Sequence, residues 1–318
     1  LPFARITFMF AIQTDNLTKK FGDLTAVDTL TLSVAEGELF GLVGSDGAGK
    51  TTTMRMLTAV MEPTSGDARV MGRHTAREAE AVKGEIGYMS QRFGLYPDLT
   101  VQENIHFYAD IFGLPRRGRA EKVDELLSFS NLLPFRKRRA SDLSGGMKQK
   151  LGLACALVHM PRVLFLDEPT NGVDPVSRRD FWRILYRLLK ERVTIFVSTA
   201  YLDEADRCNR VGLIHRGRLL ACDTPAGLKG LMQGTIVEVR AAEPRRAARL
   251  LRERMPDASV GLFGDRVHVV TGEPYEAGRL IAAACSGEGI PLLGTRTVEP
   301  SLEDVFVSVL SDNSPETV

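Results

Sequence analysis

The chain has 318 residues, which is long for a single hydrophobic core, so we expect one large domain and a smaller one. Its 44% hydrophobic and 25% charged residues are typical of a globular chain, and a formal net charge of +1 gives no global electrostatic reason to expect nucleic acid. The cysteines lack C-x-x-C spacing, which indicates neither a zinc site nor a disulfide framework and favours a reducing compartment. No run approaches the ~20 apolar residues of a membrane-spanning helix.

We interpret residues 1–9 as an N-terminal extension, followed by a strand at Ile12–Leu17.

The first informative feature is a glycine-rich loop between a strand and a helix. The run Glu38–Val43 is short and apolar, as expected of a strand buried on both faces of a parallel sheet. The next residues, Gly44–Thr51, read GSDGAGKT and precede a helix-like segment. This arrangement predicts a phosphate-binding loop.

The residue types of this loop suit a nucleoside triphosphate. Glycines lack the Cβ that would stop the backbone from wrapping around phosphates. Lys50 supplies a point charge for the outer phosphates, and the Thr51 hydroxyl is placed to bind the accompanying Mg²⁺. The positive end of the following helix points to the same place. The residues predicted to bind the phosphates are Gly44, Ser45, Asp46, Gly47, Ala48, Gly49, Lys50, Thr51 and Thr52.

A helical insertion follows the strand predicted at Ile86–Ser90. Thr100 and Glu103 form a capping box that opens a helix through Phe112, and a second helix is predicted at Arg119–Phe129. With the apolar helix that begins after Ser144, these segments predict a helical subdomain at about 92–160.

Ser144, Gly145 and Gly146 open that apolar helix in the sequence LSGGMKQ. Ser144 is a good N-cap, and two glycines let a ligand approach the backbone closely. Taken alone, the pattern is compatible either with a second anion-binding helix end or with an ordinary capped helix.

Two carboxylates end the apolar strand Val163–Leu166. Asp167 is suited to bind Mg²⁺ through water, and Glu168 is suited to take a proton from an attacking water. Further strands are predicted at Thr194–Ser198 and Val211–His215. The alternation of strands and helices predicts an α/β fold, a P-loop nucleotide hydrolase core.

From about Gly234 the pattern changes to β-α-β-β-α-β, which predicts a small ferredoxin-like α+β domain. We place its boundaries at 233–318 and those of the larger nucleotide-binding domain at 10–232. Whether the C-terminal domain stabilises a dimer, regulates it or is a structural appendage stays open. Its elements are predicted at Ile236–Arg240, Pro244–Arg254, Ser259–Phe263, Arg266–Thr271, Tyr275–Cys285 and Leu292–Val298.

The phosphate loop, LSGGMKQ and LFLDEPTNGVDP stand in an order that resembles the nucleotide-binding subunits of ATP-binding cassette (ABC) transporters. The resemblance implies that Phe21 stacks on adenine and that Gln91 contacts Mg²⁺ and acts in catalysis beside Glu168. It also implies that Ser144, Gly145 and Gly146 complete the ATP site of a second subunit, and that Asp174 lies at the dimer interface. The segment Glu299–Phe306 is similar to the tail of multidrug-type export subunits.

The resemblance predicts an ATPase whose cofactors are ATP and Mg²⁺. We expect a homo- or heterodimer of ATP-binding subunits that powers transport by separate transmembrane subunits, and no nucleic acid partner. The expected location is the cytoplasmic face of the cell membrane, where the chain is peripheral. Two alternatives stay open: a mainly nucleotide-binding regulatory cassette with slow hydrolysis, and a soluble ABC ATPase without a transport role.

Two positions depart from the family pattern. The family usually carries a histidine where this chain has Ala200, and losing one preorganised donor costs about 10²- to 10³-fold in rate. Thr199, Tyr201 or a partner residue is the expected substitute. Asp46 stands where the family more often has asparagine, which is expected to weaken phosphate binding slightly.

Overall fold

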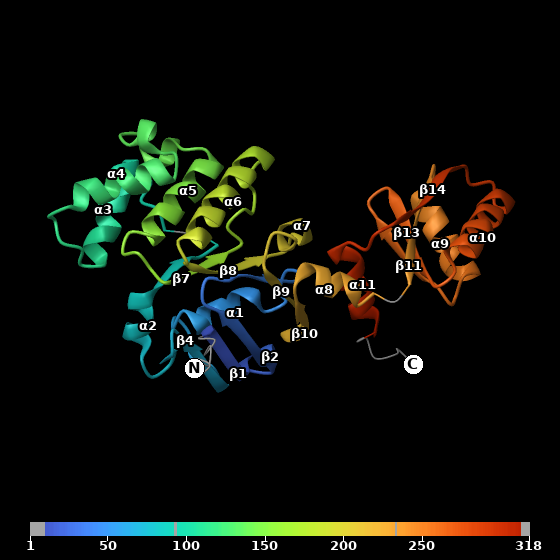
Figure 1. Ribbon diagram of the computed structural model, residues 1–318, viewed down its shortest axis with the longest axis horizontal. Helices are drawn as coiled ribbons and strands as arrows, with labels where there is room; N and C mark the ends of the chain where they lie inside the picture. Colours follow the sequence, from blue (N-terminus) through green and yellow to red (C-terminus); the bar gives the residue numbers. More distant parts are fainter. Residues whose placement is uncertain (1–9, 92–93, 233, 313–318) are drawn as a thin grey trace, which may run out of the picture. The chain divides into compact units, whose positions relative to one another are not determined.

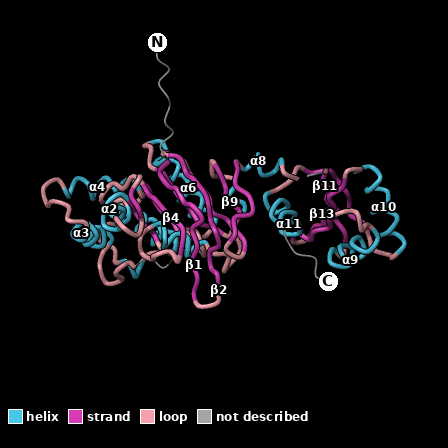
Figure 2. Tube along the Cα trace, turned by 90° about the horizontal axis from the view of Figure 1, so that it is seen from below, coloured by secondary structure: helices cyan, strands magenta, loops and turns pink. Residues whose placement is uncertain are grey.

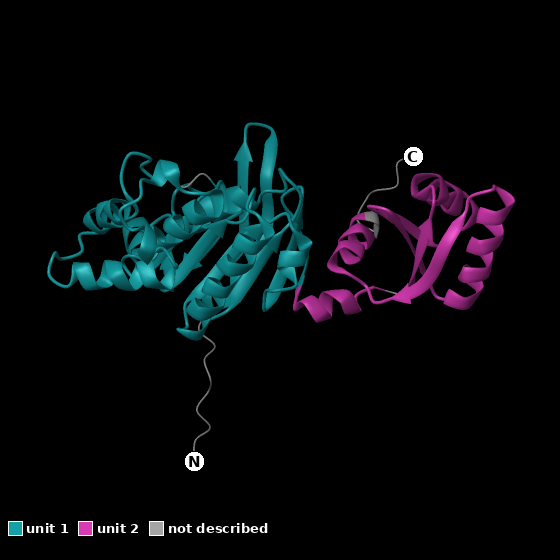
Figure 3. Ribbon diagram, turned by 90° about the horizontal axis from the view of Figure 1, so that it is seen from above, with its two compact units in different colours: residues 1–222 teal, residues 223–318 magenta. Residues whose placement is uncertain are grey.

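The computed structural model describes residues 10–91, 94–232 and 234–312. Within it the chain forms two compact units, Leu1–Cys222 and Asp223–Val318 (Figure 3). The predicted N-terminal extension lies outside the described residues. The predicted domain boundary between residues 232 and 233 stays a prediction, and the two units are considered separately below.

The centre of the first unit is a six-stranded sheet with the order β10-β9-β3-β8-β7-β6. Strands β9, β3, β8, β7 and β6 pair in parallel, and every residue of β3, β7 and β8 is buried. The strands are β3 (Leu39–Val43), β6 (Ile86–Met89), β7 (Val163–Asp167), β8 (Thr194–Thr199), β9 (Arg210–His215) and β10 (Arg218–Asp223). Because parallel strands end at one edge, the segments that follow β3, β6, β7 and β8 are brought together there.

A second, antiparallel sheet has the order β2-β1-β4-β5. Its strands are β1 (Phe10–Phe21), β2 (Leu24–Ala35), β4 (Ser65–Val70) and β5 (Arg73–His74), of which the sequence predicted only part of β1. Helix α1 (Lys50–Leu57) packs against strands of both sheets. One apolar core cluster joins Leu30 of β2, Met54 of α1 and Phe165 of β7. The phosphate-loop helix is thus fixed between the sheets.

Helices α3, α4 and α5 lie together at one end of the first unit (Figure 1). Thr100 caps α3 through the predicted reciprocal bonds, with Glu103 Oε2 accepting from Thr100 N at 2.8 Å. Helix α5 ends at Ala156, a few residues before the predicted end near His159. The helices are α2 (Ala79–Glu85), α3 (Val101–Ile111), α4 (Arg119–Phe129), α5 (Gly145–Ala156), α6 (Pro175–Lys190) and α7 (Leu202–Ala205), with 3-10 turns at Leu133–Phe135 and Ala140–Asp142.

The second unit contains the predicted β-α-β-β-α-β order as an antiparallel sheet, β12-β13-β11-β14. Apolar side chains of α9, α10, β11 and β13 form its core, and α11 lies on the other side of the sheet (Figures 1 and 2). Its elements are α8 (Pro225–Gly230), β11 (Thr235–Ala241), α9 (Pro244–Arg254), β12 (Ser259–Phe263), β13 (Arg266–Thr271), α10 (Pro274–Gly287), β14 (Leu292–Val298) and α11 (Leu302–Asp312).

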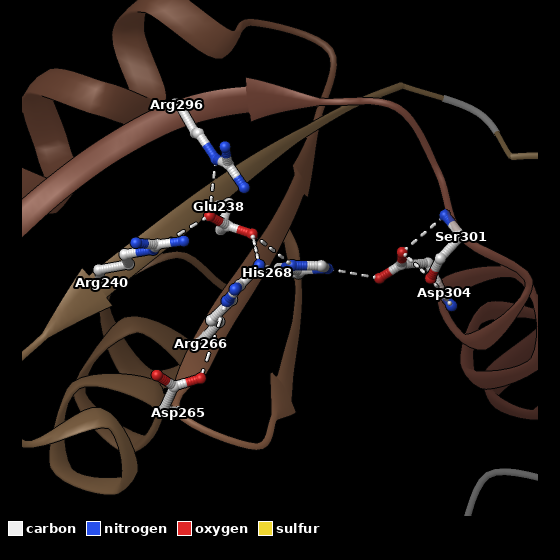
Figure 4. Close-up of polar contacts among 8 residues, drawn as sticks. All are labelled: Glu238, Arg240, Asp265, Arg266, His268, Arg296, Ser301 and Asp304. Atoms are coloured by element: carbon white, nitrogen blue, oxygen red, sulfur yellow. Dashed lines mark hydrogen bonds and ion pairs between the residues drawn. The ribbon is translucent and has the colours of Figure 1, made fainter. Parts of the chain in front are cut away.

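A polar cluster fills the sheet face that α11 covers (Figure 4). Glu238 is 3% exposed and accepts from Arg296 Nε at 2.7 Å and Arg266 Nη1 at 2.9 Å; these hydrogen bonds hold its pKa at about 2. His268 Nδ1 lies 2.7 Å from Asp304 Oδ1 and so joins β13 to the start of α11. The bond to Asp304 raises the pKa of His268. Burial alone would raise the pKa of Asp304, but bonds from His268 and Ser301 lower it.

None of the helices formed by the described residues has the length and apolar character that crossing a membrane requires.

We expect His268→Gln to weaken the attachment of α11 in a pH-dependent way. Since the folded pKa of His268 is raised, its ion pair stabilises the unit fully below the unfolded value of about 6.5 and is lost as pH rises through the folded value. The wild type should therefore protect β13 and α11 from hydrogen exchange more than His268→Gln does near pH 6, and this difference should shrink toward pH 9.

Hydrogen exchange of β13 and α11 in the full chain, corrected for intrinsic rates, measures this difference. Fluorescence of the single tryptophan, Trp182, reports on the other unit and serves as the control. A difference in protection from exchange that does not change with pH would contradict the assigned role of His268.

Candidate active site

The loop after β3 depends on glycine for two different reasons. A Cβ on Gly44 would lie 2.2 Å from the Ile214 carbonyl oxygen, so a side chain there would collide with the backbone of β9. Gly47 has open space around it, but its φ of +76° is in the left-handed region. Gly49 combines both constraints, with a φ of +105° and the Ala26 oxygen 2.5 Å from a Cβ. The loop therefore holds a bend that other residues could not adopt.

Lys50 lies at the centre of this bend. Its side chain is 4% exposed, and Nζ donates to the carbonyl oxygens of Gly44 at 2.8 Å and Ser45 at 3.0 Å. The same ammonium lies 3.2 Å from Glu168 Oε1. A buried cation needs such compensation, and its partners here come from the loop itself and from the end of β7.

Asp167 and Thr51 form the oxygen-rich part of the site. Asp167 is 1% exposed, and its Oδ1 accepts from Thr51 Oγ1 at 3.2 Å and from Ser198 Oγ at 2.6 Å. Its other oxygen, Oδ2, is buried without a hydrogen-bond partner among the described residues. An orphaned carboxylate oxygen beside a hydroxyl fits the oxygen ligands that Mg²⁺ prefers.

Glu168 is held in an uncommon backbone conformation, with a φ of 49°. Its N–H donates to Ser198 Oγ at 3.0 Å, which fixes the turn after β7. Its Oε2 accepts from Gln91 Nε2 at 3.0 Å and from Asn171 Nδ2 at 3.3 Å. Gln91 follows β6, so the structure brings together the ends of β3, β6 and β7. Gln91 contacts Glu168, and its predicted contact with Mg²⁺ stays a prediction.

A cavity of about 220 Å³ lies beside Glu168. Its lining residues are Asp46, Glu168, Thr170, Asn171, Thr199, Ala200 and Tyr201. Ala200 therefore presents a methyl group to the space next to the carboxylate, where a histidine is usual in the family that the sequence resembles.

The other predicted site residues lie at helix starts. Ser144 Oγ accepts from Met147 N at 3.3 Å and caps α5. Asp174 caps α6, and backbone hydrogen bonds, chiefly from Ser177, lower its pKa. A Cβ on Gly146 would lie 2.4 Å from the Ser177 side chain, so this glycine lets α5 pack closely on the start of α6.

Phe21 lies at the end of β1 and is 47% exposed, with Lys19 Nζ 5.4 Å from its ring centroid. It is therefore available for stacking.

Several polar residues of the site were not predicted from the sequence. Ser198 bridges Asp167 and the Glu168 backbone, and Asn171 binds the Glu168 carboxylate. Glu204 is fully buried and accepts from Thr170 at 2.5 Å and Thr199 at 2.8 Å. A signal for Ser198 was present, because its hydroxyl follows the apolar run Ile195–Val197 in a buried strand.

Comparison with known proteins agrees with this geometry. A family model described as ABC transporter matches residues 27–171. The daunorubicin resistance ATP-binding protein DrrA2 of Streptomyces coeruleorubidus is 34% identical to the chain, over 97% of each protein. The chain belongs to the ABC transporter family.

Two further relatives match a smaller share of this ABC family member. The probable multidrug ABC transporter ATP-binding protein YbhF of Escherichia coli is 43% identical over 69% of the chain, and the chain spans only 38% of YbhF. A solved dimeric ATP-binding cassette in a post-hydrolysis state, bound to ADP and Pi, is 25% identical with a TM-score of 0.62, over 67% of this chain and 98% of that one.

We expect Ser198→Ala to destabilise the first unit by about 1 to 3 kcal/mol, because it removes a buried donor to Asp167 and an acceptor for the Glu168 N–H. Denaturant unfolding followed by Trp182 fluorescence measures the loss. Ser128→Ala, at an exposed position of α4, is the matched control and should change stability by at most about 0.5 kcal/mol. Equal effects of the two variants would contradict the bridging role of Ser198.

Proposed function

We propose that the chain binds and hydrolyses ATP as a subunit of an ABC transporter. The observation that supports this most strongly is the convergence of Lys50, Gln91, Asp167 and Glu168 at one sheet edge beside a glycine loop. The loop Gly44–Thr52 would hold the phosphates through its N–H groups and the Lys50 charge.

A bound Mg²⁺ would neutralise phosphate charge, and Thr51 and Asp167 are the residues that fit it, with Gln91 as a further ligand. This assignment is supported by Asp167 Oδ2, which is buried without a hydrogen-bond partner in the described part of the chain, and by the Thr51 hydroxyl at 3.2 Å from Oδ1.

Glu168 is proposed as the general base. Its Oε1 forms an ion pair with Lys50 Nζ at 3.2 Å. Phosphate oxygens compete for the same ammonium, so ATP binding would release Oε1 toward the cavity. Oε2 would stay on Gln91 and Asn171, which keeps the carboxylate oriented. Nucleotide binding would thus activate the base.

Dimerisation is the proposed role of the remaining site residues. Ser144, Gly145, Gly146 and Asp174 lie at the starts of α5 and α6 and would contact ATP held by a second ATP-binding subunit. Phe21 would stack on the adenine. The dimeric cassette among the structural relatives supports this arrangement, and either a homodimer or a heterodimer satisfies it.

Export is the proposed direction of transport. YbhF is described as a multidrug transporter component and DrrA2 as a daunorubicin resistance protein, which supports an export branch. A separate membrane subunit would be the partner, and the part of the predicted helical insertion near 92–114 would be its contact. The chain would then lie at the cytoplasmic face of the membrane, and the C-terminal domain predicted at 233–318 would be accessory.

Ala200 supports a second candidate, a mainly nucleotide-binding regulatory cassette. Its methyl group lines the cavity beside Glu168 and cannot donate a hydrogen bond. Without a substitute donor, hydrolysis would be slower by about 10²- to 10³-fold.

We expect Glu168→Gln to lower ATP turnover by at least about 10²-fold while ATP still binds, because the variant loses the base but keeps the loop. Phosphate release by the full chain, copurified with the membrane protein to which it crosslinks, measures turnover, and binding of a fluorescent ATP analogue measures affinity. Glu191→Gln, at the exposed end of α6, is the control.

Wild-type turnover well above background that persists in Glu168→Gln would refute the proposed base. A wild type that binds ATP tightly but shows no turnover above background would favour the regulatory cassette.

A further inference from the structure

The cavity beside Glu168 contains a second layer of contacts, which the proposed base depends on. Asn171 Nδ2 donates to Glu168 Oε2 at 3.3 Å. The Tyr201 hydroxyl in turn donates to Asn171 Oδ1 at 3.5 Å. A carboxylate only accepts hydrogen bonds, so Asn171 must turn its NH₂ toward Glu168 and its carbonyl oxygen toward Tyr201. The three side chains therefore form a directed chain of hydrogen bonds that ends on the catalytic carboxylate.

The other hydroxyls that line the cavity are already used elsewhere. Thr170 and Thr199 both donate to the buried carboxylate of Glu204, at 2.5 and 2.8 Å. Thr199 is 1% exposed and also accepts from Tyr201 N at 3.0 Å, so its hydroxyl is committed at both ends. Among the described residues that line the cavity, Tyr201 is thus the hydroxyl that reaches toward Glu168.

The aromatic ring of Tyr201 packs against an arginine side chain. The Arg178 guanidinium lies 4.4 Å from its ring centroid, within the range of a cation–π contact. Arg178 is itself anchored, because its Nε lies 3.5 Å from Glu204 Oε1. The buried carboxylate of Glu204 therefore supports Tyr201 in two ways. It binds Thr199, which accepts from the Tyr201 N–H, and it pairs with Arg178, which lies over the Tyr201 ring.

We propose that Tyr201 is a positioning residue that holds Asn171, and through it Glu168, in the orientation needed for proton abstraction. This inference rests on the proposed ATPase function. Its importance follows from the release of Lys50. Once phosphates take that ammonium, the side-chain contacts of Glu168 with the described residues are those at Oε2, of which Asn171 provides one. Tyr201 then acts during turnover and not in ATP binding.

The test is Tyr201→Phe, which keeps the ring and its contact with Arg178 but removes the hydroxyl. We expect kcat to fall about 3- to 10-fold with KM and the ATP dissociation constant unchanged. Tyr186→Phe is the matched control, because it removes a tyrosine hydroxyl that donates to the Arg207 carbonyl oxygen, and it should leave kcat unchanged.

A double-mutant cycle distinguishes positioning from a merely structural effect. If Tyr201 acts through Asn171, the variant carrying both Asn171→Ala and Tyr201→Phe should be no slower than Asn171→Ala alone. Losses that multiply would overturn the proposal, and so would an unchanged kcat in Tyr201→Phe while Glu168→Gln abolishes turnover. Wild-type turnover that persists unchanged in Glu168→Gln would instead refute the proposed base, on which this inference rests.

Discussion

The candidate site depends on the ion pair between Lys50 and Glu168, which joins the phosphate loop to the end of β7 at 3.2 Å. Both side chains are largely buried, so either charge alone would be costly there. The pair links the two groups, so a polyanion that took Lys50 would change the environment of Glu168. Under the proposed function, this contact would couple nucleotide binding to the proposed base.

Around this pair the fold supplies rigidity. Strands β3, β7 and β8 are fully buried, and α1 is fixed between two sheets, so the ends of these strands form a stable frame. Buried polar groups position the side chains that extend beyond these strand ends. Ser198 serves Asp167 and Glu168, while Glu204 organises the threonines and Arg178 next to the cavity. The C-terminal unit has a separate core and a separate buried carboxylate, Glu238.

Much of the architecture could be predicted from local pattern. The bounds of α4, α9, β12, β13 and β14 agree with the prediction, because capping residues, glycine turns and apolar periodicity mark them locally. The antiparallel strands β2, β4 and β5 were not predicted, since strands of mixed polar and apolar residues carry a weak signal. The order of the C-terminal sheet follows from the predicted split-βαβ arrangement and agrees with the structure.

The sequence by itself determined the candidate site groups: the glycines and Lys50 of the phosphate loop, the two carboxylates at the end of β7 and the absence of an imidazole at Ala200. These are motifs in which residue type and spacing carry the information. Only the tertiary structure decided which atoms meet. That Gln91 reaches Glu168, that Thr170 is bound to Glu204, and that Tyr201 reaches Asn171 are contacts between separate segments. Such contacts depend on strand register and side-chain packing, which local sequence pattern does not encode.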